Sequence, residues 1–262
     1  KSNCIMDLNK NTYVFFFSTA MVLVVAALLS FTSIKLKPLQ QKNIALENKQ
    51  NILSSVGIYV SREEADLNYE KYITDSFVLD SDGQKTDIDI SSVQLNKETK
   101  KPKKEQNMPL YISNIDGSEK YIIPLRGTGL WGPIWGYISL DNDMNTVYGA
   151  VFDHKAETPG LGAEINRDFF EKPFNGKRIF DLEGDFVSIA VVKGGAKEND
   201  YHGVDGISGG TITSDGVTAM LKERLDKYLP YFENKMKENE VNDIMNFIEE
   251  DINLNDTINK LN

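Results

Sequence analysis

Residues 111–125 read YISNIDGSEKYIIPL, in which two short apolar runs flank the pair Asp116-Gly117. Runs rich in β-branched and aromatic residues on either side of Asp-Gly are typical of antiparallel strands joined by a tight turn. We therefore predict strands at residues 111–113 and 121–125.

The sequence that follows this hairpin continues the pattern. Residues 137–140 and 147–152 are apolar runs around a turn-rich segment and predict a second hairpin, and residues 186–192 predict a further strand. Across residues 214–228, apolar side chains recur at intervals of three and four, which predicts an amphipathic helix that stops before Pro230. Strands interspersed with helices predict an α+β fold with a mixed, mostly antiparallel sheet.

The segment before this domain is far more apolar. Residues 11–34 read NTYVFFFSTAMVLVVAALLSFTSI and contain no charged side chain. A helix of that length can cross a hydrocarbon core about 30 Å thick. A cleaved signal peptide would have a shorter apolar run with its small residues at the end, whereas Ala26-Ala27 lies inside this run. We predict a single retained transmembrane helix in contact with the lipid bilayer, and lysines on both sides leave its orientation undecided.

These patterns divide the chain into four segments. Residues 1–35 are expected to form the N-terminal segment and transmembrane helix, and residues 36–108 a stalk helix, ended by Gly57, with a polar connecting region. Residues 109–229 are the expected α+β domain, and residues 230–262 an acidic helical tail.

Composition excludes several classes of function. The 262-residue chain has a formal net charge of −10, which argues against nucleic acid as a partner because phosphates would be repelled. The only cysteine is Cys4, so a zinc site with four cysteine ligands or a cysteine-ligated iron–sulfur cluster is not expected. The two histidines leave few ligands for any other transition-metal site.

Two glycine-bearing segments follow the predicted strands. Residues 126–136 (RGTGLWGPIWG) hold both tryptophans, Trp131 and Trp135, which favours either walls for a flat aromatic ligand or core aromatics beside tight turns. Residues 154–165 (HKAETPGLGAEI) contain a Pro-Gly-Leu-Gly turn expected to aim Glu157 and Thr158.

A third segment, residues 205–217 (DGISGGTITSDGV), is a glycine loop running into the predicted helix. Thr213, Ser214 and Asp215 are its N-cap candidates. Backbone N–H groups of such a loop and helix start can bind a phosphate, although a capped helix without a ligand fits the spacing equally well. No lysine follows the glycines, so the segment is not a Walker A motif.

This third segment matches the flavinylation signature Asp-Gly-x-Ser/Thr-Gly-Ala-Thr, with Gly210 where alanine is usual. The matching residues are Asp205, Gly206, Ser208, Gly209 and Thr211. Two further motifs of the proteins that carry this signature also have counterparts here. They resemble residues 157–162 (ETPGLG) and the Gly129-Leu130-Trp131 segment with Tyr137. The chain thus resembles the family of the C subunit of the sodium-translocating NADH:quinone reductase, and more distantly the G subunit of Rnf complexes.

The resemblance implies a cofactor and its attachment. FMN would be linked covalently to the Thr211 hydroxyl as a phosphoester by a flavin transferase, so Thr211 is an attachment point and no residue is catalytic. The implied cofactor-binding residues are Thr211, Ser208, Gly209, Gly210, Thr213, Glu157, Thr158, Gly160, Leu161, Gly162 and Trp131. The expected domain at residues 109–229 is then an FMN-binding domain.

The resemblance also implies a cellular role. The chain would relay electrons among other subunits of a membrane reductase that oxidises NADH, reduces ubiquinone and exports sodium. It would be single-pass in the bacterial inner membrane, with the FMN domain on the periplasmic side. Three alternatives stay open: a subunit of an Rnf-type ferredoxin:NAD reductase, a membrane-tethered module that binds a phosphate ligand non-covalently, and a structural subunit without a chromophore.

Overall fold

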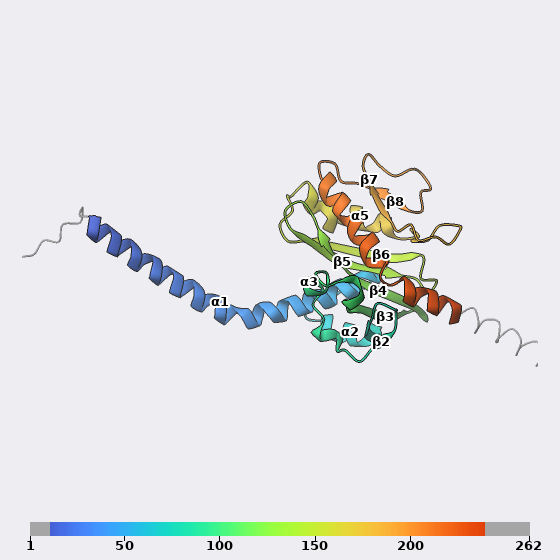
Figure 1. Ribbon diagram of the computed structural model, residues 1–262, viewed down its shortest axis with the longest axis horizontal. Coiled ribbons are helices and arrows are strands. Elements are labelled where there is room, and N and C mark those ends of the chain that lie inside the picture. Colours follow the sequence, from blue (N-terminus) through green and yellow to red (C-terminus); the bar gives the residue numbers. More distant parts are fainter. Residues whose placement is uncertain (1–10, 239–262) are drawn as a thin grey trace, which may run out of the picture. The chain divides into compact units, whose positions relative to one another are not determined.

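The computed structural model describes residues 11–238, so Cys4 and the expected tail beyond residue 238 lie outside the described residues (Figure 1). The chain divides into two compact units, residues 1–48 and residues 49–262. The first unit holds most of one long helix, and the second holds every strand.

Helix α1 (Asn11–Ser55) is continuous through Pro38, so the expected transmembrane and stalk helices are one element. Its most apolar window has a mean hydropathy of 2.5 with no residue buried, so the helix is long and apolar enough to cross a membrane. Within the apolar run, Thr19 and Thr32 donate their hydroxyls to carbonyls one turn back, which satisfies these polar groups inside the helix. The helix ends two residues before Gly57, whose φ of +77° confirms the expected terminator.

The second unit is built on a six-stranded antiparallel sheet with the order β2-β1-β3-β4-β5-β6. The strands are β1 (Ile73–Leu79), β2 (Lys85–Thr86), β3 (Met108–Ile115), β4 (Ser118–Thr128), β5 (Pro133–Leu140) and β6 (Val147–His154). Both predicted hairpins are confirmed, and the turn between β3 and β4 places Asp116 and Gly117 at φ values of +51° and +83°. Positive φ at both central residues matches the twist of the flanking strands.

The polar connecting region contributes to this sheet, although its sequence pattern did not predict a strand there. Strand β1 pairs with β3 along most of its length, so residue 109 does not mark the start of the domain. Short elements fill the rest of the region. They are α2 (Ala65–Tyr72), α3 (Leu95–Glu98) and the 3₁₀ turns η1 (Ile90–Ser92) and η2 (Lys103–Glu105).

Two further corrections concern the C-terminal half. Only β7 (Ala190–Val192) is a strand in the predicted stretch 186–192, because Ser188 has a φ of +63° that interrupts extended backbone, and β7 pairs in parallel with β8 (Gly203–Asp205). Helix α5 (Thr211–Leu225) begins three residues earlier than predicted. The remaining elements are η3 (Gly162–Asn166), α4 (Asp168–Glu171), η4 (Lys172–Phe174) and a helical segment at residues 229–238.

The two faces of the sheet bury different partners. Tyr121, Ile123 and Leu125 of β4 pack into the main core with α5 and the segment 165–191. Ile122, which points to the opposite face, packs with Ile52 in the last turns of α1. Alternation along one strand therefore gives the sheet two buried faces.

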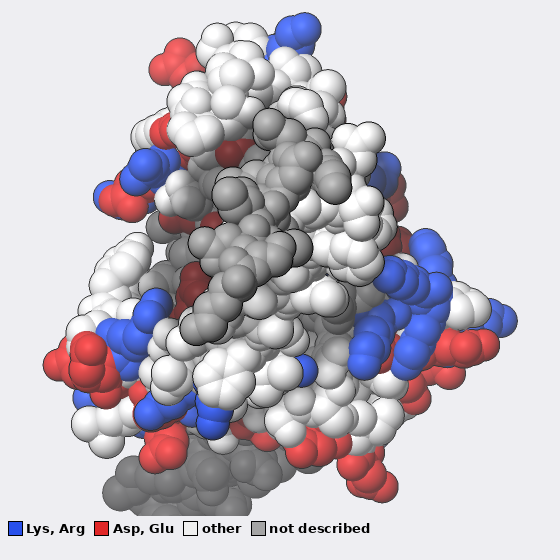
Figure 2. All heavy atoms as spheres, turned by 90° about the vertical axis from the view of Figure 1, so that its left-hand side faces the viewer, with Lys and Arg blue, Asp and Glu red and all other residues white. Residues whose placement is uncertain are grey.

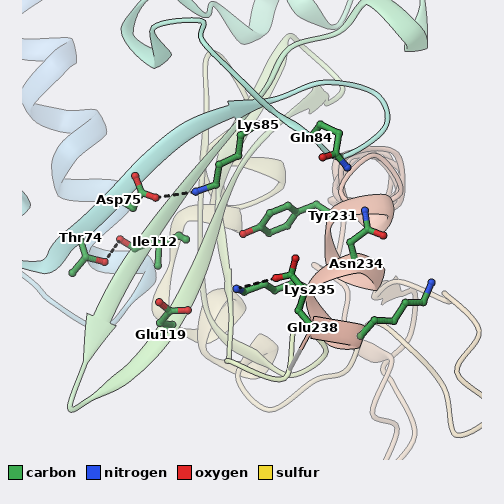
Figure 3. A pocket seen from close by; sticks show the side chains of 12 residues that line it. Thr74, Asp75, Gln84, Lys85, Ile112, Glu119, Tyr231, Asn234, Lys235 and Glu238 are labelled. Atoms are coloured by element: carbon green, nitrogen blue, oxygen red, sulfur yellow. Dashed lines mark hydrogen bonds and ion pairs between the residues drawn. The ribbon is translucent and has the colours of Figure 1, made fainter. Parts of the chain in front are cut away.

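The surface of the second unit carries charges of both signs. Figure 2 shows acidic and basic side chains close to one another around the edge of the view. A groove of about 980 Å³ lies between β1 and the helical segment 229–238, from which Tyr231 projects (Figure 3). On the strand side of the groove, Lys85 Nζ pairs with Asp75 Oδ2 at 3.2 Å.

Edge strand β6 is covered partly by a carboxyl group. Glu171 in α4 accepts a hydrogen bond from the backbone N–H of Phe152 at 2.7 Å. Burial raises the pKa of Glu171 to about 7; the nearby carboxylates of Asp168 and Asp153 add to the increase, and the Phe152 hydrogen bond opposes it. The native state therefore holds this proton more tightly than the unfolded chain does.

We expect the protein to lose stability as the pH rises from 5 to 8, because the raised pKa of Glu171, about 7, favours the folded state only while this carboxyl is protonated. Glu171→Gln should make the melting temperature nearly independent of pH in this range and higher than wild type at pH 8. Thermal unfolding by circular dichroism at each pH measures this. Glu183→Gln, at an exposed position, is the control and should follow wild type. Parallel pH profiles for wild type and Glu171→Gln would contradict the assignment.

Candidate functional site

Helix α5 packs against strand β4 of the sheet (Figure 1), and two glycines permit a close approach between them. A Cβ on Gly216 of α5 would collide with the carbonyl oxygen of Thr128 at the end of β4. A Cβ on Gly127 would lie 2.7 Å from the Cβ of Met220. Backbone packing against backbone fixes the start of α5 beside the loop that follows β4.

The first turn of α5 offers free hydrogen-bond donors. The helix starts at Thr211, Gly210 is its N-cap without a side-chain cap, and the first helical bond runs from Ser214 N to Gly210 O at 2.9 Å. The N–H groups of Thr211, Ile212 and Thr213 therefore have no partner within the helix. Together with the helix dipole, they favour an anionic group at this position.

The hydroxyls of this loop differ in environment. Thr211 is half-buried, and its hydroxyl makes no hydrogen bond to any residue that the structure describes. Ser214 accepts a bond from Ile207 N at 3.3 Å, and Ser208 is exposed. Thr211 is thus partly accessible, and its hydroxyl oxygen has no hydrogen bond to any described residue.

Thr213 does not cap the helix, contrary to the sequence prediction. It lies inside the first turn, is 1% exposed, and donates its hydroxyl to Glu157 Oε2 at 2.5 Å. The other N-cap candidates, Ser214 and Asp215, are also inside the helix. The start of α5 is set instead by Gly210, whose buried position faces Gly162.

Glu157 connects segments that are distant in sequence. Its Oε1 accepts from Trp131 N at 2.8 Å, and its Oε2 accepts from Thr213. Burial raises the pKa of this carboxyl, but the hydrogen bonds from Thr213, Trp131 and Leu130 outweigh burial and leave the pKa below its usual value. Glu157 is therefore favoured in its ionised form, with one hydrogen bond to each carboxylate oxygen. His154 supports its backbone by accepting from Glu157 N at 3.2 Å.

A cavity of about 210 Å³ brings most of the predicted residues together. Its lining residues are Leu130, Glu157, Thr158, Leu161, Gly162, Gly209, Gly210, Thr211, Ile212 and Thr213. Leu130 and Ile212 were not predicted from the sequence, although each adjoins a predicted residue. Gly160 does not line this cavity; its φ of +77° serves the turn.

Ser208 lines a second cavity, of about 450 Å³, which shares Gly209 and Thr211 with the first. Asp205 also lines it, and its Oδ1 accepts from Ala196 N at 2.7 Å, so this carboxylate holds the neighbouring loop. Thr211 is thus reached from two cavities.

Exposed apolar side chains surround the first cavity. Trp131 is 66% exposed, which excludes the core-aromatic interpretation for this residue, while Trp135 is half-buried on β5. Leu130 and Ile212 are also exposed. Exposed apolar groups beside free N–H donors suit a ligand with a flat aromatic part and an anionic part.

Known proteins match this chain over the region just described. The model of the FMN-binding domain family matches residues 129–226. The C subunit of the Na(+)-translocating NADH-quinone reductase from Vibrio anguillarum is 32% identical over 215 residues, which are 76% of this chain and 84% of that protein. The chain belongs to this C-subunit family. The family resemblance found in the sequence is therefore confirmed.

Solved structures agree with this assignment. The C subunit from Parabacteroides distasonis is 44% identical with a TM-score of 0.70, and the match covers 75% of this chain and 96% of that one. The corresponding protein from Shewanella oneidensis is 26% identical with a TM-score of 0.63, over 73% of this chain and 96% of that one. The matched FMN-binding domain contains the cavity, Glu157 and the first turn of α5.

The contact at Gly216 predicts whether Gly216→Ala raises or lowers the stability of the protein. Alanine is favoured over glycine inside a helix by about 1 kcal/mol, so helix propensity alone predicts that Gly216→Ala stabilises the protein. Because the added methyl would collide with the Thr128 carbonyl, we expect destabilisation by about 1–3 kcal/mol instead. Urea unfolding measures the change, and Asp215→Ala, at an exposed position, should alter stability by no more than about 0.5 kcal/mol. A more stable Gly216→Ala protein would contradict the close approach.

Proposed function

We propose that this chain is a membrane-anchored electron-transfer subunit of a sodium-translocating NADH:quinone reductase, with FMN attached covalently to Thr211. Membership of the C-subunit family and the matched FMN-binding domain support the role. The observation that carries the attachment site is the Thr211 hydroxyl, which is accessible and uncommitted at the N-terminus of α5.

The residues around Thr211 fit an FMN phosphoester. The oxygen of Thr211 would form a bond to the FMN phosphorus of a phosphoanhydride donor bound by a flavin transferase. The P–O bond of that anhydride would break, its other phosphate would leave, and the hydroxyl proton would pass to a base of the transferase. The resulting phosphodiester keeps one negative charge, which the free N–H groups of Thr211, Ile212 and Thr213 and the helix dipole stabilise. When bound, FMN supplies one-electron chemistry that side chains cannot provide.

The remaining cavity residues would hold the flavin rather than react with it. Leu130, Leu161 and Ile212 present apolar surface, and Gly209 and Gly162 let the main chain approach the cofactor closely. Thr158, Gly160, Gly210 and Ser208 would shape the loops that carry these residues. We assign no acid, base or nucleophilic role in electron transfer to any of them.

Replacing Thr211 tests the attachment. After co-expression with a flavin transferase, wild-type protein should gain the mass of one FMN and fluoresce in a denaturing gel. Thr211→Ala should carry no covalent flavin and should remain folded, because the lost hydroxyl has no hydrogen-bond partner within residues 11–238. Thr218→Ala removes another hydroxyl from α5, outside both cavities at Thr211, and should keep the flavin. Flavin that survives denaturation on Thr211→Ala would place the bond elsewhere, and wild-type flavin lost on denaturation would indicate a non-covalent phosphate site.

We further propose that α1 anchors the protein in the bacterial inner membrane, with the FMN domain on the periplasmic side. The uncharged run at residues 11–34 supports the anchor, and the side rests on the family resemblance. The partners are then the lipid bilayer and the other subunits of the reductase, between whose cofactors this FMN would relay electrons.

Truncation tests the anchor. The full chain should sediment with membranes and require detergent, because its apolar side chains in α1 are exposed. A chain lacking residues 1–34 should stay in the soluble fraction as a folded protein, since the second unit has its own core. Size-exclusion chromatography and circular dichroism without detergent measure this. Full-length protein that remains soluble without detergent would contradict the proposal.

A further inference from the structure

The carboxylate of Glu157, which is 4% exposed, lines the cavity at Thr211 and also contacts the segments on both sides of it. It contacts the loop after β4 through Trp131 N and the first turn of α5 through Thr213 Oγ1. Glu157 itself follows β6. One side chain therefore joins the ends of two strands to the start of the helix that carries Thr211.

Two glycines leave space for this carboxylate. A Cβ on Gly129 would lie 2.7 Å from Glu157 Oε1, and a Cβ on Gly162 would lie 2.6 Å from Glu157 Oε2 and collide with Thr213 Oγ1. Neither glycine has a positive φ, so backbone conformation does not require them. Because these glycines have no side chain, the loops that contain Gly129 and Gly162 can pack directly against the Glu157–Thr213 pair.

The electrostatics keep this pair together. The net lowering of the Glu157 pKa means that the folded state favours the charged form, which accepts all of these hydrogen bonds. A buried carboxylate that loses one donor is costly, and so is a buried hydroxyl that loses its acceptor. The loop and the helix are thus coupled through a group that tolerates little rearrangement.

We propose that Glu157 is a positioning residue for flavin attachment. Its carboxylate holds the first turn of α5 against the Leu130–Trp131 loop, so that the Thr211 hydroxyl opens onto the cavity in a fixed orientation. Glu157 does not touch the reacting oxygen; it acts through Thr213, two residues further along the helix. This assignment rests on the proposed attachment of FMN to Thr211.

Variants at Thr213 test the coupling while keeping the charge. Thr213→Val removes the donor with little change in shape, and Thr213→Ser restores it. With purified full-length protein in detergent, a flavin transferase and its flavin donor, intact mass spectrometry follows the rate of FMN addition. We expect Thr213→Val and Glu157→Ala to react about tenfold more slowly or worse, since hydrogen bonds to charged groups are the strong ones. Thr213→Ser should recover a rate close to wild type.

Thr218→Val is the matched control for simple loss of stability. Thr218 lies on the same helix, and its hydroxyl accepts from Val191 N at 2.9 Å, but it makes no bond to Glu157. Thr218→Val should keep a rate within about twofold of wild type at temperatures where all variants are folded, because this bond contributes to stability and not to the orientation of Thr211. An equal loss of rate in Thr218→Val and Thr213→Val, or an unchanged rate in Thr213→Val, would overturn the proposal.

A second measurement does not depend on flavin. In a Trp135→Phe background Trp131 is the only tryptophan, and its time-resolved anisotropy reports the motion of the loop in flavin-free protein. Thr213→Val and Glu157→Ala should increase this motion, and Thr213→Ser should not. Unchanged anisotropy in Glu157→Ala would overturn the positioning role, whereas wild type that gains no FMN would contradict only the proposed attachment.

Discussion

The approach of one backbone to another, Gly216 of α5 against the Thr128 carbonyl, is the constraint on which the rest of the site depends. With any side chain between them, the helix would sit further from β4, and its first turn would move away from the loop at Leu130. Glu157 could then not bridge both elements. The cavity at Thr211 is therefore a consequence of helix–sheet distance as much as of its own lining residues.

Different groups of the site attract an anion and hold the start of α5 in place. Free N–H groups at the start of α5 provide attraction for an anion, and this part needs no charged side chain. The Glu157–Thr213 pair is buried, and its hydrogen bond ties Glu157 to the turn that carries those N–H groups. The cost of burying an ionised carboxylate near an anion site is offset by the hydrogen bonds that this carboxylate accepts.

The parts of this fold that could be predicted from sequence depend on local patterns. The hairpins around Asp116-Gly117 and after residue 137 were predicted because apolar runs and turn residues alternate within a few positions. Strand β1 was not predicted, because it lies in a polar region and is stabilised by pairing with β3, whose paired residues, from Met108 to Ser113, lie far along the chain. Ser188 interrupts the last predicted strand through a positive φ that no propensity reveals.

In the candidate site too, local motifs could be predicted from the sequence, whereas contacts between distant residues could not. The glycine loop and the proposed attachment residue were identified through a family signature, and the Pro-Gly turn pointed to Glu157. Thr213 was expected to cap the helix because hydroxyls are common there. It bonds to Glu157 instead, a partner 56 residues away in sequence, and no local rule anticipates a tertiary partner at that separation. Leu130 and Ile212 were not predicted as site residues, because a single apolar side chain next to a predicted residue has no distinctive spacing.

The alternation of Ile122 and Ile123 along β4 has a consequence for how the protein can evolve. Ile122 serves the face that receives the end of α1, and Ile123 serves the face that receives α5. Deletion of one codon within β4 would exchange the two sets of side chains, so both interfaces would fail at once. Changes in length are then confined to the connections between strands, and this central strand can diverge only by substitution.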